Sequence, residues 1–174
     1  PPIYTLNYYN AIANGGKLMR PYLVREIRRD GHVIMKNSPE VINSSICKSS
    51  TLKKVQGMLE GVIGYGTAKA NKSNEFGIAG KTGTAQVHKD RSDNAVFTAF
   101  APFDNPEIIA TCVIENGNTG SNAGFAVKRL FDYHFGIGYY ADSDSTEDVA
   151  DTDESYADAE ENAADVQEGS VNEE

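Results

Sequence analysis

A lysine, a glycine and two threonines stand together in a segment that otherwise has the pattern of a β-strand. They are Lys81, Thr82, Gly83 and Thr84, within residues 76–87. Glycine weakens a strand and is best explained where a second backbone must come close. Gly80 and Gly83 therefore favour a strand edge that binds an extended ligand through main-chain hydrogen bonds.

The alternation of side chains along a strand divides these groups between two faces. Lys81, Gly83 and Ala85 are expected on one face, and Thr82 and Thr84 on the other. A local twist of the strand would be needed to bring all the polar groups together, so periodicity alone does not define a site. A phosphate loop is excluded, because Glu75 stands where the pattern G-x-x-x-x-G-K-[ST] requires its first glycine.

The cysteines and histidines show no spacing that is typical of a metal site. Cys47 and Cys112 lie 65 positions apart, and the three histidines are not spaced as ligands with them. We therefore expect no metal and no cofactor. Cys112 is interpreted as a small buried hydrophobe, although one disulfide between the two cysteines stays open. The positive charges of residues 1–141 are spread out without an aromatic cluster, so no nucleic-acid partner is expected.

Helical spacing of apolar residues predicts three helices. The first covers residues 5–14, with Thr5 as a candidate N-cap. The second has Ser49 or Ser50 as its candidate N-cap and ends at the glycines of residues 64–66. The third covers residues 124–135, where His134 is expected at the edge of the core.

Two sets of strands are expected between these helices. Residues 18–29 and 32–36 flank Asp30-Gly31, a strong signal for a two-residue hairpin turn. Residues 76–87, 95–103 and 108–115 are separated by turn-prone stretches and are expected to be adjacent antiparallel strands. The predicted fold class therefore mixes α and β structure, as an antiparallel sheet with packing helices.

Charge divides the chain into a basic part and an acidic tail. Residues 142–174 hold 14 of the 25 acidic residues and none of the 16 lysines and arginines, so residues 1–141 carry a net charge of +5. The tail has no Leu, Ile or Phe, and cannot bury enough apolar area to offset the entropy of ordering. We expect one domain over residues 1–141 and a disordered acidic tail over residues 142–174. The sequence predicts neither a membrane span nor a signal peptide.

The run around Lys81 resembles the K-T-G motif of penicillin-binding proteins and serine β-lactamases. Other segments are similar to the class B penicillin-binding proteins, in the same order: residues 11–17 (Ala-Ile-Ala-Asn-Gly-Gly-Lys), Arg20-Pro21, residues 66–68 (Gly-Thr-Ala), residues 79–86, residues 100–102 (Phe-Ala-Pro) and residues 114–117 (Ile-Glu-Asn-Gly). The Glu-Asn-Gly ending resembles the elongation type, penicillin-binding protein 2. The resemblance covers about residues 4–137. It implies the C-terminal part of a transpeptidase domain with the penicillin-binding protein/serine β-lactamase-like fold.

In that family, a serine of an S-x-x-K motif is acylated by the D-Ala-D-Ala end of a peptidoglycan stem peptide, and the acyl group passes to an amine. The resemblance implies that Lys81 supplies positive charge and helps proton transfer. It also implies that the hydroxyls of Thr82 and Thr84, with Gly83 between them, bind the substrate carboxylate, and that the Thr84 N–H is an oxyanion donor. Lys81 and Thr84 are thus the implied catalytic residues.

The same resemblance implies partners and a location. β-Lactams and the stem peptide are the implied ligands, and membrane proteins of the elongation machinery are implied partners. The implied location is the periplasmic or extracytoplasmic face of the bacterial cell membrane, with an anchor in an upstream segment.

The chain departs from the family pattern in its first two motifs. Residues 45–48 and 50–53 satisfy S-x-x-K, but the second run falls at the start of the helix before the K-T-G strand. Residues 92–94 satisfy the second motif, S-x-N, but follow Lys81 instead of preceding it. We reject these matches. We therefore expect a fragment that lacks its nucleophile, is inactive alone and exposes apolar surface that promotes association.

Two other interpretations stay open at this point. A non-catalytic module would hold a cell-wall partner on the strand edge and the hairpin. A D,D-carboxypeptidase or a β-lactamase-like hydrolase would use the same K-T-G strand. The hydroxyl of Thr67 is interpreted as turn chemistry rather than as part of a site.

Overall fold

The computed structural model describes residues 1–87 and 89–138. The predicted domain boundary between residues 141 and 142 and the predicted disordered tail lie outside these residues, and so does His88. The described elements are, in chain order, α1 (Pro2–Ala13), β1 (Leu18–Met19), β2 (Glu26–Arg29), β3 (His32–Lys36), β4 (Val41–Asn43), α2 (Ser49–Gly64), the 3-10 helix η1 (Lys69–Asn71), β5 (Ala79–Ala85), β6 (Asn94–Ala101), β7 (Ile108–Ile114) and α3 (Gly120–His134).

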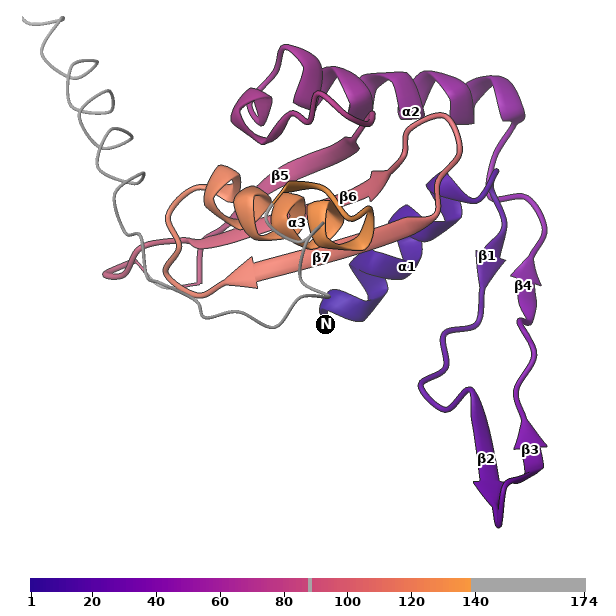
Figure 1. The fold of residues 1–174 in the computed structure, drawn as a ribbon. Coiled ribbons are helices and arrows are strands. Elements are labelled where there is room, and N and C mark those ends of the chain that lie inside the picture. Colours follow the sequence, from indigo (N-terminus) through magenta and orange to yellow (C-terminus); the bar gives the residue numbers. More distant parts are fainter. Residues whose placement is uncertain (88, 139–174) are drawn as a thin grey trace, which may run out of the picture. The chain divides into compact units, whose positions relative to one another are not determined.

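The centre of the fold is a three-stranded antiparallel sheet in the order β5-β6-β7, as the sequence predicted. The ladder between β5 and β6 runs from Ala79 opposite Phe100 to Ala85 opposite Asn94. All seven residues of β7 are paired with β6. β6 is therefore the central strand, and β5 is an edge strand of this sheet (Figure 1).

Helices cover both faces of this sheet, because β6 is apolar on both sides. On one face, Phe97 and three alanines of β6 pack with α3, through Val127 and Phe131. On the other face, Phe100 packs with Ile12 of α1 and with Leu52 and Leu59 of α2. A strand buried on both faces loses the apolar–polar alternation of a half-exposed strand. The result is two cores that share one strand.

The β2–β3 hairpin confirms the turn predicted at Asp30 and Gly31. Both turn residues have positive φ, 50° and 80°, which is what a two-residue hairpin turn of this type requires. β2 and β3 contact each other but no other helix or strand within residues 1–87 and 89–138. Figure 1 shows them extending away from the sheet. The sequence did not predict β4, which pairs with β1.

The starts of the three helices correct the sequence analysis. α1 begins at Pro2, not after Thr5, because proline at the first helical position needs no N–H partner. α2 has Lys48 as its N-cap, so neither Ser49 nor Ser50 caps it. The first-turn N–H groups of α2 bond instead to the carbonyl oxygen of Lys48.

α3 also differs from its prediction, both in where it begins and in which residues of its C-terminal half are buried. It begins at Gly120, four residues earlier than expected. The prediction for His134 was wrong, because the residue is exposed, although its ring lies in a T-shaped arrangement with that of Phe135. Leu130, which was expected on the same packing face, is 47% exposed. No helix within the described ranges has both the length and the apolar character needed to cross a membrane.

Candidate functional site

The K-T-G residues lie on β5, the edge strand of the central sheet. Lys81 is opposite Thr98 of β6, and Thr82 is opposite Phe97. Because cross-strand partners share a face, Thr82 lies on the α3 side of the sheet and Lys81 on the other side. The predicted division of lysine and threonines between two faces is therefore confirmed.

The two glycines of this strand differ: neighbours within the fold explain Gly80, whereas a Cβ atom at Gly83 would meet nothing nearer than the Val96 Cβ at 3.4 Å. A Cβ atom at Gly80 would lie 2.5 Å from the Cβ of Ala99 and 2.7 Å from the Thr98 carbonyl oxygen. A Cβ atom at Gly120, the first residue of α3, would lie 2.8 Å from both the backbone N and O of Gly83. At Gly80 a second backbone does come close, as the sequence indicated, but it belongs to β6. Gly80 therefore does not by itself define a ligand edge, and the contacts of Gly120 explain why α3 begins with a glycine.

The Lys81 side chain folds back along its own strand. Its Nζ donates to the carbonyl oxygen of Thr82 at 2.7 Å and lies 3.4 Å from the Thr82 hydroxyl oxygen. From the alternation of side chains, a twist of the strand was expected to be needed to bring these groups together. The long, flexible stem of the lysine does this instead. The ammonium group stays exposed to solvent, so it can also meet an anionic ligand.

Thr67 is the residue that the sequence analysis did not assign to the site. Its hydroxyl oxygen lies 3.1 Å from that of Thr82, fifteen residues away in the chain. The segment Gly66-Thr67-Ala68 had been singled out, but no spacing rule connects a turn after a helix with the middle of a strand. Only the packing of α2 against β5, with η1 packed on α2 and α3, brings the two hydroxyls together.

Thr84 is exposed near the C-terminal end of β5, directly after Gly83. Within the described residues, its hydroxyl makes no hydrogen bond, so it is available to a ligand. Thr84 is opposite Ala95, a buried residue of the core on the α3 side, and therefore shares the face of Thr82. Two hydroxyls and one ammonium group thus lie within four consecutive residues of an edge strand.

The serines that match S-x-x-K do not have the arrangement of a serine–lysine pair. The Ser45 hydroxyl donates to the carbonyl oxygen of Cys47 at 3.0 Å, not toward Lys48. Ser50 is exposed in the first turn of α2, and its hydroxyl makes no hydrogen bond within the described chain. A serine nucleophile needs a base within hydrogen-bond reach. These contacts support the rejection of both matches.

The S-x-N match at residues 92–94 covers the end of the loop between β5 and β6 and the first residue of β6, Asn94. The Asn94 side-chain oxygen accepts from the backbone N–H of Asn116, and the Asp93 carbonyl oxygen accepts from that of Asn118. These bonds tie the loop to the turn after β7. The segment therefore has a structural role at the end of the sheet.

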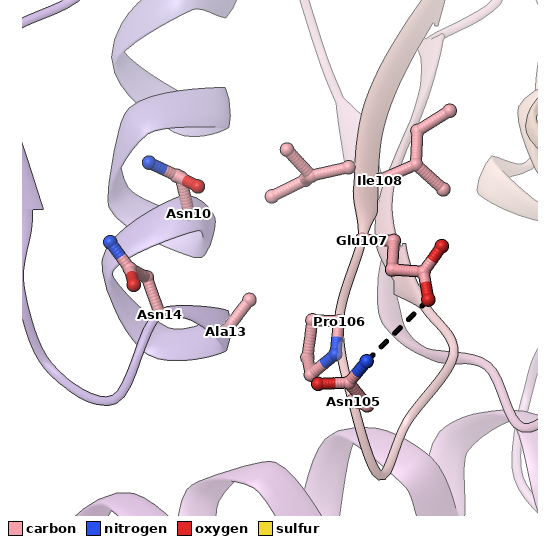
Figure 2. Close-up of a pocket in the computed structure, with 8 residues that line it drawn as sticks. Asn10, Ala13, Asn14, Asn105, Pro106, Glu107 and Ile108 are labelled. Carbon is pink, nitrogen blue, oxygen red and sulfur yellow. Dashed lines mark hydrogen bonds between the residues drawn. The ribbon is translucent and has the colours of Figure 1, made fainter. Parts of the chain in front are cut away.

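A pocket of about 350 Å³ lies away from these residues, between α1 and the connection from β6 to β7. Figure 2 shows Asn10 and Ala13 of α1, with Asn14 directly after the helix, on one side of it and Asn105 and Pro106 on the other. Its lining includes no residue of β5. The pocket therefore gives no reason to move the candidate site from the K-T-G strand.

Neither a metal cluster nor a disulfide is found in the part of the chain that the structure describes. No group of three or more His, Cys, Asp or Glu side chains there could hold a metal ion. Cys47 and Cys112 are both free thiols and half-buried. Burial raises the pKa of the Cys112 thiol, which favours its neutral, less reactive form.

Comparison with known proteins identifies the family. Residues 2–132 match the penicillin binding protein transpeptidase domain, so the chain belongs to this family. It is 32% identical to penicillin-binding protein 2A of Bacillus subtilis over 167 residues, which covers 84% of this chain and 23% of the relative. It is also 32% identical to the peptidoglycan D,D-transpeptidase MrdA of Acinetobacter baumannii, over 70% of this chain and 20% of the relative.

Solved structures agree with this assignment. The imipenem acyl-enzyme complex of penicillin-binding protein A from M. tuberculosis matches 77% of this chain and 30% of that chain, with 25% identity and a TM-score of 0.69. Pseudomonas aeruginosa PBP2 in complex with WCK 5153 matches 76% of this chain and 30% of that chain, with 31% identity and a TM-score of 0.62. The chain therefore has the penicillin-binding protein fold and is similar to the penicillin-binding protein 2 type.

The chain spans only about a fifth to a quarter of the length of the curated relatives named above. The matched part includes β5 and the helices on both faces of the sheet. The expectation that the chain corresponds to a piece of a transpeptidase domain is consistent with this coverage.

Proposed function

We propose that this chain supplies one wall of the active site of a peptidoglycan D,D-transpeptidase that is acylated by β-lactams. One observation carries the proposal. In a member of the transpeptidase family, Lys81, Thr82 and Thr84 present an ammonium group and two hydroxyls on an edge strand. This set of donors suits the terminal carboxylate of a D-Ala-D-Ala stem peptide and the carboxylate of a penicillin.

The proposed reaction is acyl transfer through a serine. The serine oxygen attacks the carbonyl carbon between the two D-alanines, the bond to the last D-alanine breaks, and that residue leaves as a free amino acid. An amine of a second stem peptide then takes the acyl group and restores the serine. The contacts of Ser45 and Ser50 described above favour a nucleophile in a part of the protein outside these 174 residues.

Each β5 residue has a distinct role in this proposal. Lys81 places positive charge beside the carboxylate and assists proton transfer. Thr82 and Thr84 donate hydrogen bonds to the carboxylate, each contributing about 1.5–3 kcal/mol as bonds to a charged group. The N–H of Thr84 stabilises the oxyanion, and loss of such a donor costs on the order of 100-fold in rate or more. Gly83 gives the substrate backbone close access to the strand.

The family also supports a place for this chemistry. Peptidoglycan cross-linking occurs outside the cytoplasm, so we place the protein at the periplasmic or extracytoplasmic face of the bacterial membrane. Similarity to the penicillin-binding protein 2 type favours a role in cell elongation, with membrane proteins of that machinery as partners. Residues 139–174, including the acidic tail, have no assigned role in this proposal.

Intact mass after incubation with benzylpenicillin tests the acylation. We expect an adduct on the longer protein that contains this chain and its upstream sequence, and none on the 174-residue chain. An adduct on the short chain would overturn the assignment of the nucleophile and point to Ser45 or Ser50. No adduct on the folded longer protein would overturn the proposed activity and favour a non-catalytic module.

A second assay separates transpeptidation from hydrolysis. The longer protein is incubated with a stem pentapeptide donor and an amine acceptor, and products are separated by mass. A cross-linked product supports the transpeptidase. A product that has lost D-alanine without gaining the amine would show a D,D-carboxypeptidase instead.

A further inference from the structure

We propose that Thr67 is a positioning residue that directs the hydroxyl proton of Thr82 toward the carboxylate of a bound ligand. The inference rests on the proposed function, and it adds a residue outside the K-T-G strand. The starting observation is the 3.1 Å separation of the two hydroxyl oxygens, in which either could be the donor. The direction of that hydrogen bond decides what Thr82 can offer to a ligand.

A hydroxyl group has one proton to donate and two lone pairs that accept. The Lys81 ammonium group can only donate, and its Nζ lies 3.4 Å from the Thr82 oxygen, so it occupies one lone pair of Thr82. When Thr67 donates as well, the second lone pair is occupied. The Thr82 proton then has no acceptor among Lys81 and Thr67, and it points to whatever anionic group lies over the strand.

The opposite direction is less useful for binding. If Thr82 donated to Thr67, its proton would be used inside the protein, and its remaining lone pair would face an anion. An acceptor facing a carboxylate is repulsive. An anionic ligand therefore selects the arrangement in which Thr67 donates, and the hydrogen bonds polarise one another in the same direction.

Thr67 is held in place by hydrogen bonds from the elements around it. The Ser121 hydroxyl, in the first turn of α3, donates to the Thr67 carbonyl oxygen at 3.0 Å. Asn71 is 1% exposed, and its side-chain nitrogen donates to the Ser121 carbonyl oxygen at 3.3 Å. The N–H of the next residue, Ala68, bonds to the Val62 carbonyl oxygen of α2 at 3.1 Å.

This anchoring explains why an exposed hydroxyl can keep a defined orientation. Thr67 is fixed from three elements, α2, η1 and α3, and Gly120 allows α3 to begin directly against the backbone of Gly83. A preorganised donor loses little conformational entropy when a ligand binds. We therefore expect Thr67 to strengthen the binding of ligands that carry a carboxylate, and to have little effect on the same ligands without that charge.

The test compares benzylpenicillin with its methyl ester on the longer protein that contains this chain. We expect Thr67→Val to lower the second-order acylation rate constant for benzylpenicillin about tenfold, mainly through weaker binding before acylation. The slower reaction of the ester should change by less than twofold. Thr67→Ser keeps the hydroxyl and should restore the rate with benzylpenicillin. Thr51→Val, at an exposed α2 threonine whose hydroxyl makes no hydrogen bond in the described chain, is the matched control.

The possible outcomes distinguish a failure of the proposed Thr67 role from a failure of the proposed transpeptidase function. Equal rates for Thr67→Val and the parent protein would overturn the positioning role and leave the proposed function standing. Equal losses for acid and ester would show that Thr67 acts only in folding. Absence of acylation in the parent protein would overturn both proposals. If Thr67→Val fails to fold, Ser121→Ala is the second variant, because it removes the hydrogen bond that anchors Thr67. It should lower the acylation rate constant for benzylpenicillin more than that for the methyl ester.

Discussion

At the scale of single residues, the glycines of β5 lie against different neighbours. Gly80 faces the Ala99 side chain across the β5–β6 ladder, whereas the backbone of Gly83 lies against Gly120 at the start of α3. A strand glycine is often taken as a sign that a ligand approaches. For Gly80 the neighbouring strand supplies the close approach, and the ligand-binding capacity of β5 comes from the hydroxyls and the ammonium group.

Gly80→Ala should destabilise the fold. Its Cβ would lie 2.5 Å from the Ala99 Cβ and 2.7 Å from the Thr98 carbonyl oxygen, and the sheet backbone cannot easily move away. We expect a loss of about 1–3 kcal/mol in the free energy of unfolding, measured by urea denaturation. Gly57→Ala, in α2 with nothing within 4 Å of the new Cβ, is the control and should gain about 0.5–1 kcal/mol. A neutral Gly80→Ala would contradict the close packing of β5 on β6.

At the scale of elements, α3 contributes to one of the two cores through a narrow stripe of buried side chains. Phe131 is fully buried and Val127 is 3% exposed, while Phe125 and Leu130 are about half exposed. A helix that packs one stripe against a sheet concentrates its stabilisation in a few large side chains. The first turn of the same helix supplies Ser121 to the candidate site, so loss of this packing would also disturb Thr67.

Phe131→Ala should be severe and Phe125→Ala mild. Removing the buried ring leaves a cavity beside Phe97 and Val127, and such changes cost about 3–5 kcal/mol. Phe125 is 49% exposed, and its truncation should cost less than about 1 kcal/mol. Thermal and urea unfolding of both variants measure the difference. Similar losses in the two variants would show that α3 packs on the sheet through a different face.

The β1–β4 pair is held by a charged contact that depends on pH. Arg20, directly after β1, donates two hydrogen bonds to Glu40, directly before β4, at 2.7 and 3.0 Å. The hydrogen bonds from Arg20 hold the pKa of the Glu40 carboxyl below its ordinary value of 4.5. A depressed carboxyl pKa stabilises the fold above the unfolded-state pKa, and this contribution is lost as the pH falls through the folded-state pKa.

NMR titration of the Glu40 side chain checks this contact. We expect a titration midpoint below 4.5 in the parent chain, and a midpoint at a higher pH in Arg20→Ala, because the donor is removed. The contact is solvent-exposed, so high salt should reduce the difference. Identical midpoints in the two proteins would show that the pair does not persist in solution.

At the scale of the whole described region, the β2–β3 hairpin and the segment before it leave many apolar side chains in water. Leu23 is 99% exposed, and Ile34 is 56% exposed. The other members of this exposed apolar cluster are Tyr22, Val24, Ile27, Val33 and Met35. Apolar side chains exposed in such number promote association. The sequence-based expectation of an association-prone chain remains a prediction, and this cluster gives it a location.

A double substitution in this cluster should reduce self-association without weakening the fold. Leu23→Ser with Ile34→Thr removes apolar area that is mostly in water already, so the free energy of unfolding should change by less than about 0.5 kcal/mol per substitution. Sedimentation velocity at increasing concentrations of the 174-residue chain measures association. Tyr4→Ser, at a side chain of α1 that is 71% exposed and outside the cluster, is the control. If the control reduces association as much as the double substitution, the hairpin is not the contact surface.

Local sequence patterns predicted much of this fold, because the helical and strand periods of the backbone set the spacing of apolar and polar residues. Alternation placed Lys81 and Thr82 on opposite faces, and helical spacing located α2. The Asp30-Gly31 pair specified its turn through two residues that tolerate positive φ. Helix starts were harder to predict, because a proline or a carbonyl group can take the place of the side-chain caps expected at Thr5 and at Ser49 or Ser50.

By itself, the sequence determined the element types, the strand that carries the candidate chemistry and the family to which its motifs belong. Only the tertiary structure decided that Thr67 meets Thr82 and that Gly80 is required by Ala99. The physical reason is that these contacts join residues far apart in the chain. Their geometry follows from how α2 and α3 pack on the sheet and how η1 packs on these two helices, and no short-range sequence pattern encodes that packing.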